Sequence, residues 1–342
     1  MSDTTGVPAE TPSTTQCSIG VCVPILRNNH VTDIWTLTGA STDIHIDTGT
    51  LACSKARRAE ATVHAEVSRV ERVFSIDDDT SILNRWIDDA SMKTSGEFDE
   101  LLATALMWQR VSRGVFNVST RRLRNLWEQA AADGCQPSPG ELHELAIIIT
   151  EPPYRFDGHV LRQLRNCREV DLSAIAEGFA IDVASEAVLR RCDLTHLTVS
   201  AFDKIVHRGD VDLSVSIDAF ADCDGVSPTV TLRNAAVALR LSKGRGPLID
   251  GERVATDVFD PRTARQVNGG VSVAVVAPDA TTADAVATIV SIMSPEHGIG
   301  FVDSLNSVGR SRHPSERSTD ANSGIQCWTL DSHGALRSTG PG

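Results

Sequence analysis

The hydrophobic pattern of the chain predicts four main helices and a series of short strands. Between residues 53 and 74, alanines and valines recur every three or four positions, the period of a helix that buries one face. Three further stretches predict helices, at 98–112, 175–190 and 282–293. Alternating or β-branched segments predict strands at 34–48, 194–202, 211–217, 227–233, 235–241 and 271–278.

The connections between the later strands are short, which indicates antiparallel pairing. The predicted fold is therefore a single α+β domain over residues 31–342, with an antiparallel sheet packed against the helices. Residues 1–30 are assigned to a disordered tail, because its first half is rich in Ser, Thr and Pro. A final hairpin is predicted around Asp331–Gly334, and residues 304–323 are predicted to form a mobile loop.

Composition narrows the range of partners. The formal net charge of -13 argues against a surface that binds nucleic acid or an anionic membrane. The eight cysteines are scattered and form no CxxC or Cys/His cluster, so they are interpreted as mostly buried or incidental thiols in a reducing compartment. We find neither a basic and apolar leader nor an apolar run of membrane-spanning length. The expectation is a soluble, cytoplasmic protein.

The stretch Glu169–Leu189 is the first candidate for chemistry. It is predicted to open as a short strand and to continue as a helix from Ile175, with Ser173 as the N-cap. Gly178 lies in the second turn, where it costs about 1 kcal/mol relative to Ala, so a close backbone approach is expected there. A glycine beside a helix N-terminus suits phosphate, because unpaired amides favour anions. The alternative is an ordinary amphipathic helix, which the apolar periodicity alone favours.

Asp284 and Thr288 are the second candidate. They are four residues apart in the predicted helix 282–293, so their side chains lie one above the other on the same face. Carboxylate and hydroxyl oxygens suit a hard cation such as Mg²⁺, which commonly takes only one or two ligands from protein side chains. The alternative is an exposed aspartate near a helix start and a threonine that bonds back to its own helix.

The segment 257–265, DVFDPRTAR, is the third candidate. Asp260 and Pro261 predict a tight turn after a strand, and the turn carries two arginines that can bind an anion. A plain hairpin corner explains the same pattern equally well.

These stretches together resemble a known family, the ApbE family of FAD:protein FMN transferases. The resemblance extends from about residue 35 to 338 and includes four ungapped blocks: FNVSTRRLRNLW (116–127), DLSAIAEGFAID (171–182), DVFDPRTARQV (257–267) and VAVVAPDATTADAVAT (273–288). Each block alone is unspecific, whereas their combination is specific. The resemblance implies an ApbE-like fold, related to the T-fold.

The resemblance also implies an activity. It predicts a Mg²⁺-dependent enzyme that cleaves the pyrophosphate of FAD and passes FMN to a Ser or Thr hydroxyl of an acceptor flavoprotein. The implied metal ligands are Asp284, Thr288 and the backbone carbonyl of Ala174. The implied catalytic positions are Asp257 and Glu177. The implied cofactor-binding residues are Asn117, Ser119, Ser173, Gly178, Asp203 and Asp260.

Several positions depart from the family pattern. The lysine of the family's A-K-G motif is Glu177 here, and a family histidine is Asp257. A carboxylate in place of the lysine opposes a pyrophosphate, so we expect weaker nucleotide binding that Glu177→Lys would partly restore. Ala201–Phe202 replaces a pair of glycines before Asp203, which predicts a pocket narrowed at its flavin end.

The departures leave other functions open. Trp86 and Phe202 are expected to offer stacking surfaces for a different ring. One alternative function is a catalytically impaired paralogue that binds FAD or a related dinucleotide. Another is a partner-binding protein that retains only the fold.

Overall fold

The structure is a computed structural model of the chain. It describes residues 35–36, 44–48, 53–94, 96–165, 167–220, 227–242, 248–249, 252–253, 258–267, 271–312 and 324–339. The predicted tail of residues 1–30 lies outside the described residues.

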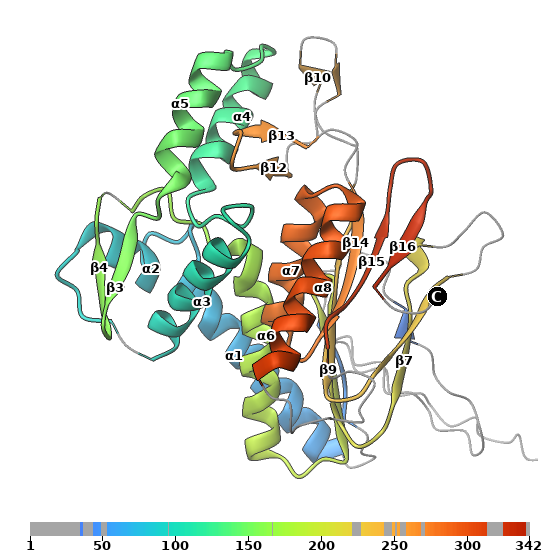
Figure 1. Ribbon diagram of the computed structural model, residues 1–342. Coiled ribbons are helices and arrows are strands. Elements are labelled where there is room, and N and C mark those ends of the chain that lie inside the picture. The colour runs from blue at the N-terminus through green and yellow to red at the C-terminus, as the bar shows by residue number, and fades with distance from the viewer. Residues whose placement is uncertain are drawn as a thin grey trace, which may run out of the picture.

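A seven-stranded sheet forms the centre of the fold (Figure 1). The strand order is β16-β15-β14-β9-β6-β5-β2, and every neighbouring pair is antiparallel. The strands are β2 (His45–Asp47), β5 (His196–Ala201), β6 (Lys204–Gly209), β9 (Ala235–Arg240), β14 (Ser272–Ala277), β15 (Gln326–Leu330) and β16 (Leu336–Ser338). The sheet confirms the predicted antiparallel architecture and the predicted final hairpin.

Both faces of this sheet are covered. Helices lie on one face: α1 (Cys53–Phe74), α6 (Ser173–Arg191), α7 (Ala280–Ile292) and α8 (Pro295–Arg312). The other face carries a small sheet of β1 (Trp35–Thr36), β7 (Leu213–Ser216) and β8 (Thr229–Leu232). Successive side chains of a strand alternate between the faces. In β6, Val206 accordingly packs into the core beneath the helices, and Ile205 into the core beneath the small sheet.

A group of shorter elements contacts α1 and α6 and lies to the left of α6 in Figure 1. It contains α2 (Ile82–Asp88), α3 (Glu97–Val111), α4 (Arg121–Asp133), α5 (Pro139–Thr150), β3 (Tyr154–Asp157) and β4 (Val160–Gln163). A hairpin of β12 (Phe259–Asp260) and β13 (Arg265–Gln266) lies beside α4 and α5 at the top of Figure 1. The Trp127 indole donates to the Ala264 carbonyl at 2.9 Å, which fastens α4 to this hairpin. The remaining short elements are β10 (Leu248–Ile249), β11 (Glu252–Arg253) and a 3-10 helix, Asp218–Phe220.

Most element predictions are confirmed, and three are wrong. Residues 304–312 belong to helix α8, although a mobile loop was predicted for 304–323. Val170–Leu172 is a buried coil rather than a strand, because the Asp171 amide bonds to Val118 of a preceding loop and not to a sheet neighbour. Helix α6 begins at Ser173 itself, with Leu172 at its N-cap position. In the described part of the chain, no helix combines the length and apolarity needed to cross a bilayer.

Candidate functional site

The start of helix α6 is held by ionic contacts from α4. The buried Asp171 carboxylate accepts a hydrogen bond from the Ser173 amide at 2.9 Å, so it caps the helix in place of the predicted Ser173 side chain. Arg124 pairs with Asp171, with 2.9 Å between guanidinium nitrogen and carboxylate oxygen. The same guanidinium lies 3.4 Å from the Ser173 hydroxyl. An arginine is thereby fixed over the first turn of α6.

Two cavities meet at this turn, because Arg124 and Ser173 border both of them. The first has a volume of about 490 Å³ and is also bordered by Ala174, Thr288 and Arg240. The second has a volume of about 580 Å³, and its lining residues include Glu177 and Phe202. Ala174 and Thr288 are thus brought to one cavity, as the metal-site prediction requires, while Glu177 lies on the other side of the turn.

Asp284 lies in the interior between α7 and the sheet. Its carboxylate is buried, with one oxygen 3.4 Å from the Lys204 ammonium and the other 3.7 Å from the Arg240 guanidinium. Burial raises the pKa of this carboxyl group, and the two cations partly offset that effect. Both distances exceed that of a well-formed hydrogen bond. The Lys204 and Arg240 side chains therefore compensate the negative charge of Asp284, while one carboxylate oxygen of Asp284 still lacks a hydrogen-bond donor.

Two buried oxygens at this position have unused bonding capacity. Within the described ranges, neither Oδ2 of Asp284 nor Oγ1 of Thr288 has a hydrogen-bond partner. Buried polar atoms are normally satisfied, so such a pair fits a ligand that bonds to both. The described residues contain no group of three or more His, Cys, Asp or Glu side chains suited to a metal ion. A metal here would thus depend on one carboxylate, the Thr288 hydroxyl and a backbone carbonyl, a donor set that suits Mg²⁺.

Lys204 is the residue that sequence reasoning missed. It is the first residue of β6 and lies on the same side of the strand as Val206, so its side chain extends beneath the helices. The ammonium donates to the Glu177 carboxylate at 2.7 Å and to the Phe202 carbonyl at 2.8 Å. Only 5% of the Lys204 side chain is exposed. Period-two alternation in KIVHRG, 204–209, is the signal that could have placed this lysine on the helix side.

The contact with Lys204 changes the interpretation of Glu177. The sequence suggested a lone carboxylate that would repel a pyrophosphate, whereas the structure pairs it with an ammonium. Glu177→Lys would now place a second ammonium against Lys204. The expectation that this substitution strengthens nucleotide binding stays a prediction, since a second ammonium would also attract phosphate.

The turn between β5 and β6 keeps a backbone suited to glycine. Ala201 pairs with Lys204, which leaves a two-residue turn of Phe202 (φ 53°) and Asp203 (φ 60°). Both residues are in the left-handed region, where a side chain such as that of Phe202 costs about 1 kcal/mol. The Asp203 carbonyl accepts from the Leu239 amide at 2.9 Å, which joins the turn to β9. The flavin-end position of Phe202 and the cofactor role of Asp203 stay predictions.

Gly178 marks the crossing of α6 and α7. A Cβ at this position would lie 2.5 Å from the Ala280 carbonyl oxygen, well inside van der Waals contact. One turn later, Asp182 accepts hydrogen bonds from the Ala280 and Thr281 amides at 2.9 and 2.8 Å. The close backbone approach expected at Gly178 is therefore made by the first turn of α7. A cofactor is not needed to explain this glycine.

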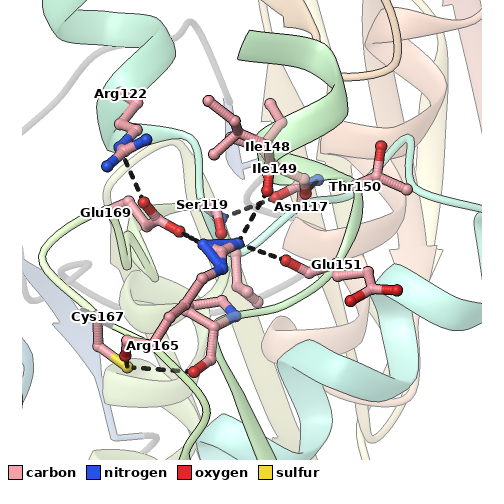
Figure 2. Close-up of polar contacts among 12 residues, drawn as sticks. Asn117, Ser119, Arg122, Ile148, Ile149, Thr150, Glu151, Arg165, Cys167 and Glu169 are labelled. Carbon is pink, nitrogen blue, oxygen red and sulfur yellow. Dashed lines mark hydrogen bonds and ion pairs between the residues drawn. The ribbon is translucent and has the colours of Figure 1, made fainter. Parts of the chain in front are cut away.

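Asn117 and Ser119 lie in the loop that precedes α4 (Figure 2). The Asn117 amide oxygen accepts from the Ser119 backbone at 2.8 Å, and its nitrogen donates to the Ile149 carbonyl at 2.9 Å. Both polar functions of Asn117 therefore hold the loop itself. The Ser119 hydroxyl is buried and has no hydrogen-bond partner in the part of the chain that the structure describes. Direct contact of either residue with FAD stays a prediction.

A buried glutamate, Glu169, connects helix α4 with the residues before α6. Figure 2 shows Glu169 between Arg122 and Arg165, and the Arg122 ion pair measures 2.9 Å. Arg165 also donates to the carbonyls of Ile148 and Glu151, at 3.0 and 2.6 Å. This network connects the C-terminal end of α5 to the segment that precedes α6 and so fixes the position of the start of α6.

The remaining predicted residues divide into three cases. The Asp260 carboxylate accepts from the Arg262 amide at 3.0 Å and from its guanidinium at 2.9 and 2.8 Å, which is the arrangement of a hairpin corner. Asp257 lies outside the described residues. Trp86 is 1% exposed and packs edge-on against Phe98 and Tyr154, so the expectation that it stacks on a ligand is wrong.

Known structures share this fold. The chain is similar to the flavin transferase ApbE from Vibrio cholerae, with a TM-score of 0.66 and 20% identity, over 88% of this chain and 94% of that one. It is also similar to the ApbE protein from Thermotoga maritima, with a TM-score of 0.68 and 22% identity, over 85% and 91% of the two chains. A third similar structure is the apo flavinyl transferase ApbE from Pseudomonas stutzeri, with a TM-score of 0.63, 17% identity and coverage of 83% and 86%.

Sequence comparison identifies the family independently of these structures. No curated protein matches the sequence significantly. A family model described as the ApbE family matches residues 38–309, which is most of the domain. The chain therefore belongs to the ApbE family.

Proposed function

We propose that the chain is an FAD:protein FMN transferase, which moves the FMN part of FAD onto a Ser or Thr hydroxyl of an acceptor protein. Membership of the ApbE family supports the reaction class. The observation that carries the proposal is the pair of buried, unsatisfied oxygens on one face of α7, Oδ2 of Asp284 and Oγ1 of Thr288, of which Thr288 borders a cavity together with Ala174. These residues fit a bound Mg²⁺, with Asp284, Thr288 and the Ala174 carbonyl as its protein ligands.

The reaction exchanges one phosphoester for another. The acceptor hydroxyl oxygen bonds to the FMN phosphorus, the bond from that phosphorus to the bridging oxygen breaks, and AMP leaves with the bridging oxygen. Bound Mg²⁺ supplies charge neutralisation at the phosphates. Arg124 and Arg240 border the cavity and offer guanidinium groups to phosphate oxygens. We assign removal of the hydroxyl proton to Asp257 on the basis of its position in the family pattern.

A second candidate function is dinucleotide binding without transfer. The observation that favours it is Phe202, a bulky residue in a turn whose backbone suits glycine, bordering the cavity next to Glu177. A pocket narrowed in this way would still bind a nucleotide but would prevent the FMN phosphate and an acceptor hydroxyl from reaching the arrangement that transfer requires.

Release of AMP separates the two functions. The purified protein is incubated with FAD and Mg²⁺ in the presence and absence of candidate acceptor domains, and AMP is quantified by chromatography. The first function predicts AMP that depends on Mg²⁺ and disappears in Asp284→Ala. Asp303→Asn, an exposed change on α8, serves as the matched control and should behave like the unmodified protein. Retained FAD without AMP, in the presence of Mg²⁺, would instead support binding alone.

A further inference from the structure

The charged side chains around Asp284 offset one another. Lys204 lies between two carboxylates, 2.7 Å from that of Glu177 and 3.4 Å from that of Asp284. Arg240 approaches the other oxygen of Asp284 at 3.7 Å. Two positive and two negative side chains, Lys204 and Arg240 against Glu177 and Asp284, therefore balance one another.

The burial of Lys204 keeps its ammonium close to the two carboxylates. Its ammonium is buried on the helix-facing side of β6, and the Phe202 carbonyl adds a further acceptor at 2.8 Å. The ammonium donates to the Glu177 carboxylate and the Phe202 carbonyl, and the Asp284 carboxylate lies 3.4 Å away, so these groups replace the water that burial removes. Lys204 therefore holds a positive charge next to Asp284, the only carboxylate among the predicted metal ligands.

A divalent cation that reaches Asp284 must enter against this charge. Like charges a few ångströms apart inside a protein repel strongly enough to change binding by about an order of magnitude or more. A pyrophosphate contributes the negative charge that offsets the repulsion and offers Lys204 another partner. We propose that Lys204 makes divalent-cation binding at Asp284 dependent on the dinucleotide, so that metal and nucleotide bind together.

This inference rests on the metal site of the proposed function, and it concerns binding rather than turnover. If metal and nucleotide help each other to bind, the effect is reciprocal, because the two affinities are linked through one free energy. A lysine that only fills the interior would predict no such coupling. The two possibilities therefore differ in metal affinity measured without nucleotide.

Mn²⁺ titration followed by electron paramagnetic resonance tests the inference on the full-length protein. Lys204→Met keeps the length of the side chain and removes its charge. We expect Lys204→Met to bind Mn²⁺ alone at least about tenfold more tightly than the unmodified protein, since two carboxylates then face the ion. Addition of ADP should raise Mn²⁺ affinity at least about tenfold in the unmodified protein and by a smaller factor in Lys204→Met.

Two further variants serve as controls, one for misfolding of Lys204→Met and one for the general effect of removing a positive charge. Glu177→Gln retains Lys204 and frees it to pair with Asp284, so Mn²⁺ alone should bind less tightly than in the unmodified protein. Lys55→Met removes an exposed lysine that pairs with Asp193 and should leave Mn²⁺ affinity unchanged. If Lys204→Met fails to fold, a Mn²⁺ affinity in Glu177→Gln equal to or above that of the unmodified protein overturns the inference.

The outcomes also separate this inference from the proposed function. AMP release by the unmodified protein, with equal Mn²⁺ affinities in Lys204→Met and the unmodified protein, overturns the role of Lys204 and leaves the function standing. Absence of AMP release overturns the function, while the Mn²⁺ comparison still decides the coupling. Absence of Mn²⁺ binding in every variant, with or without ADP, overturns the coupling as well.

Discussion

Gly178→Ala is the most direct perturbation of the contact that brings α6 and α7 together. The new Cβ would lie 2.5 Å from the Ala280 carbonyl oxygen and 3.0 Å from the Thr281 Cα. Both are backbone atoms, so no side chain can rotate away. To restore ordinary contact at about 3.4 Å, the helices must separate by nearly an ångström.

The size of the effect follows from two opposing contributions. Alanine is favoured over glycine within a helix by about 1 kcal/mol. Overpacking of a tight contact costs about 1–3 kcal/mol, and helix separation also stretches the Asp182 hydrogen bonds to the first turn of α7. The backbone clash and the stretched hydrogen bonds place the cost near the upper end of that range, at about 2–3 kcal/mol, which leaves a net loss of about 1–2 kcal/mol in the free energy of unfolding.

Urea unfolding measures this loss, and the chain offers a matched control. Gly300 lies in the exposed face of α8, where an added Cβ would meet nothing within 4 Å. Gly300→Ala should therefore raise the free energy of unfolding by up to about 1 kcal/mol. A Gly178→Ala protein as stable as the unmodified one, beside a stabilised Gly300→Ala protein, would refute the reasoning about the helix crossing.

Three further predictions concern charged residues of the site. Glu177→Lys should lower the free energy of unfolding measured with urea, because it places a second ammonium against the buried Lys204; an unchanged free energy of unfolding would contradict the pairing. Burial raises the pKa of Asp182 from 3.8 to about 6, so its contribution to stability is present below about pH 4 and lost as the pH rises past about 6. The free energy of unfolding should therefore decrease between about pH 4 and about pH 7, and Asp182→Asn should make this decrease smaller by at most about 3 kcal/mol. A decrease of the same size in Asp182→Asn and the unmodified protein would contradict the prediction. Asp284→Ala should abolish Mg²⁺-dependent AMP release with an unaltered circular dichroism spectrum, since Lys204 keeps Glu177 as its partner.

Helices with strong apolar periodicity were predictable from the sequence. The bounds of α1 agree with the prediction because Ala59, Val63, Val67 and Val70 form one buried stripe along the helix. Strand β6 was missed because it carries Lys204, His207 and Arg208 among its six residues. Two of these polar groups pair with residues of helix α6, Lys204 with Glu177 and Arg208 with Asp182, which no local pattern reveals.

The same limit applies to the candidate site. The Asp284–Thr288 pair could be proposed from its spacing, since both residues are on one helix. The contacts of Lys204 with Glu177 and Asp284 join three separate elements, and no local pattern encodes them. Gly178 was recognised as a point of close approach, but only the fold identifies α7 as the neighbour.

A crystal structure of the protein with Mn²⁺ and ADP would test the central claim most directly. The anomalous signal of manganese locates the ion without reference to any assumed ligand. We expect one peak that lies about 2.0–2.6 Å from an Asp284 carboxylate oxygen, the Thr288 hydroxyl and the Ala174 carbonyl. A peak elsewhere on the protein, or separations of these three oxygens beyond about 5 Å with ADP bound, would contradict the metal site.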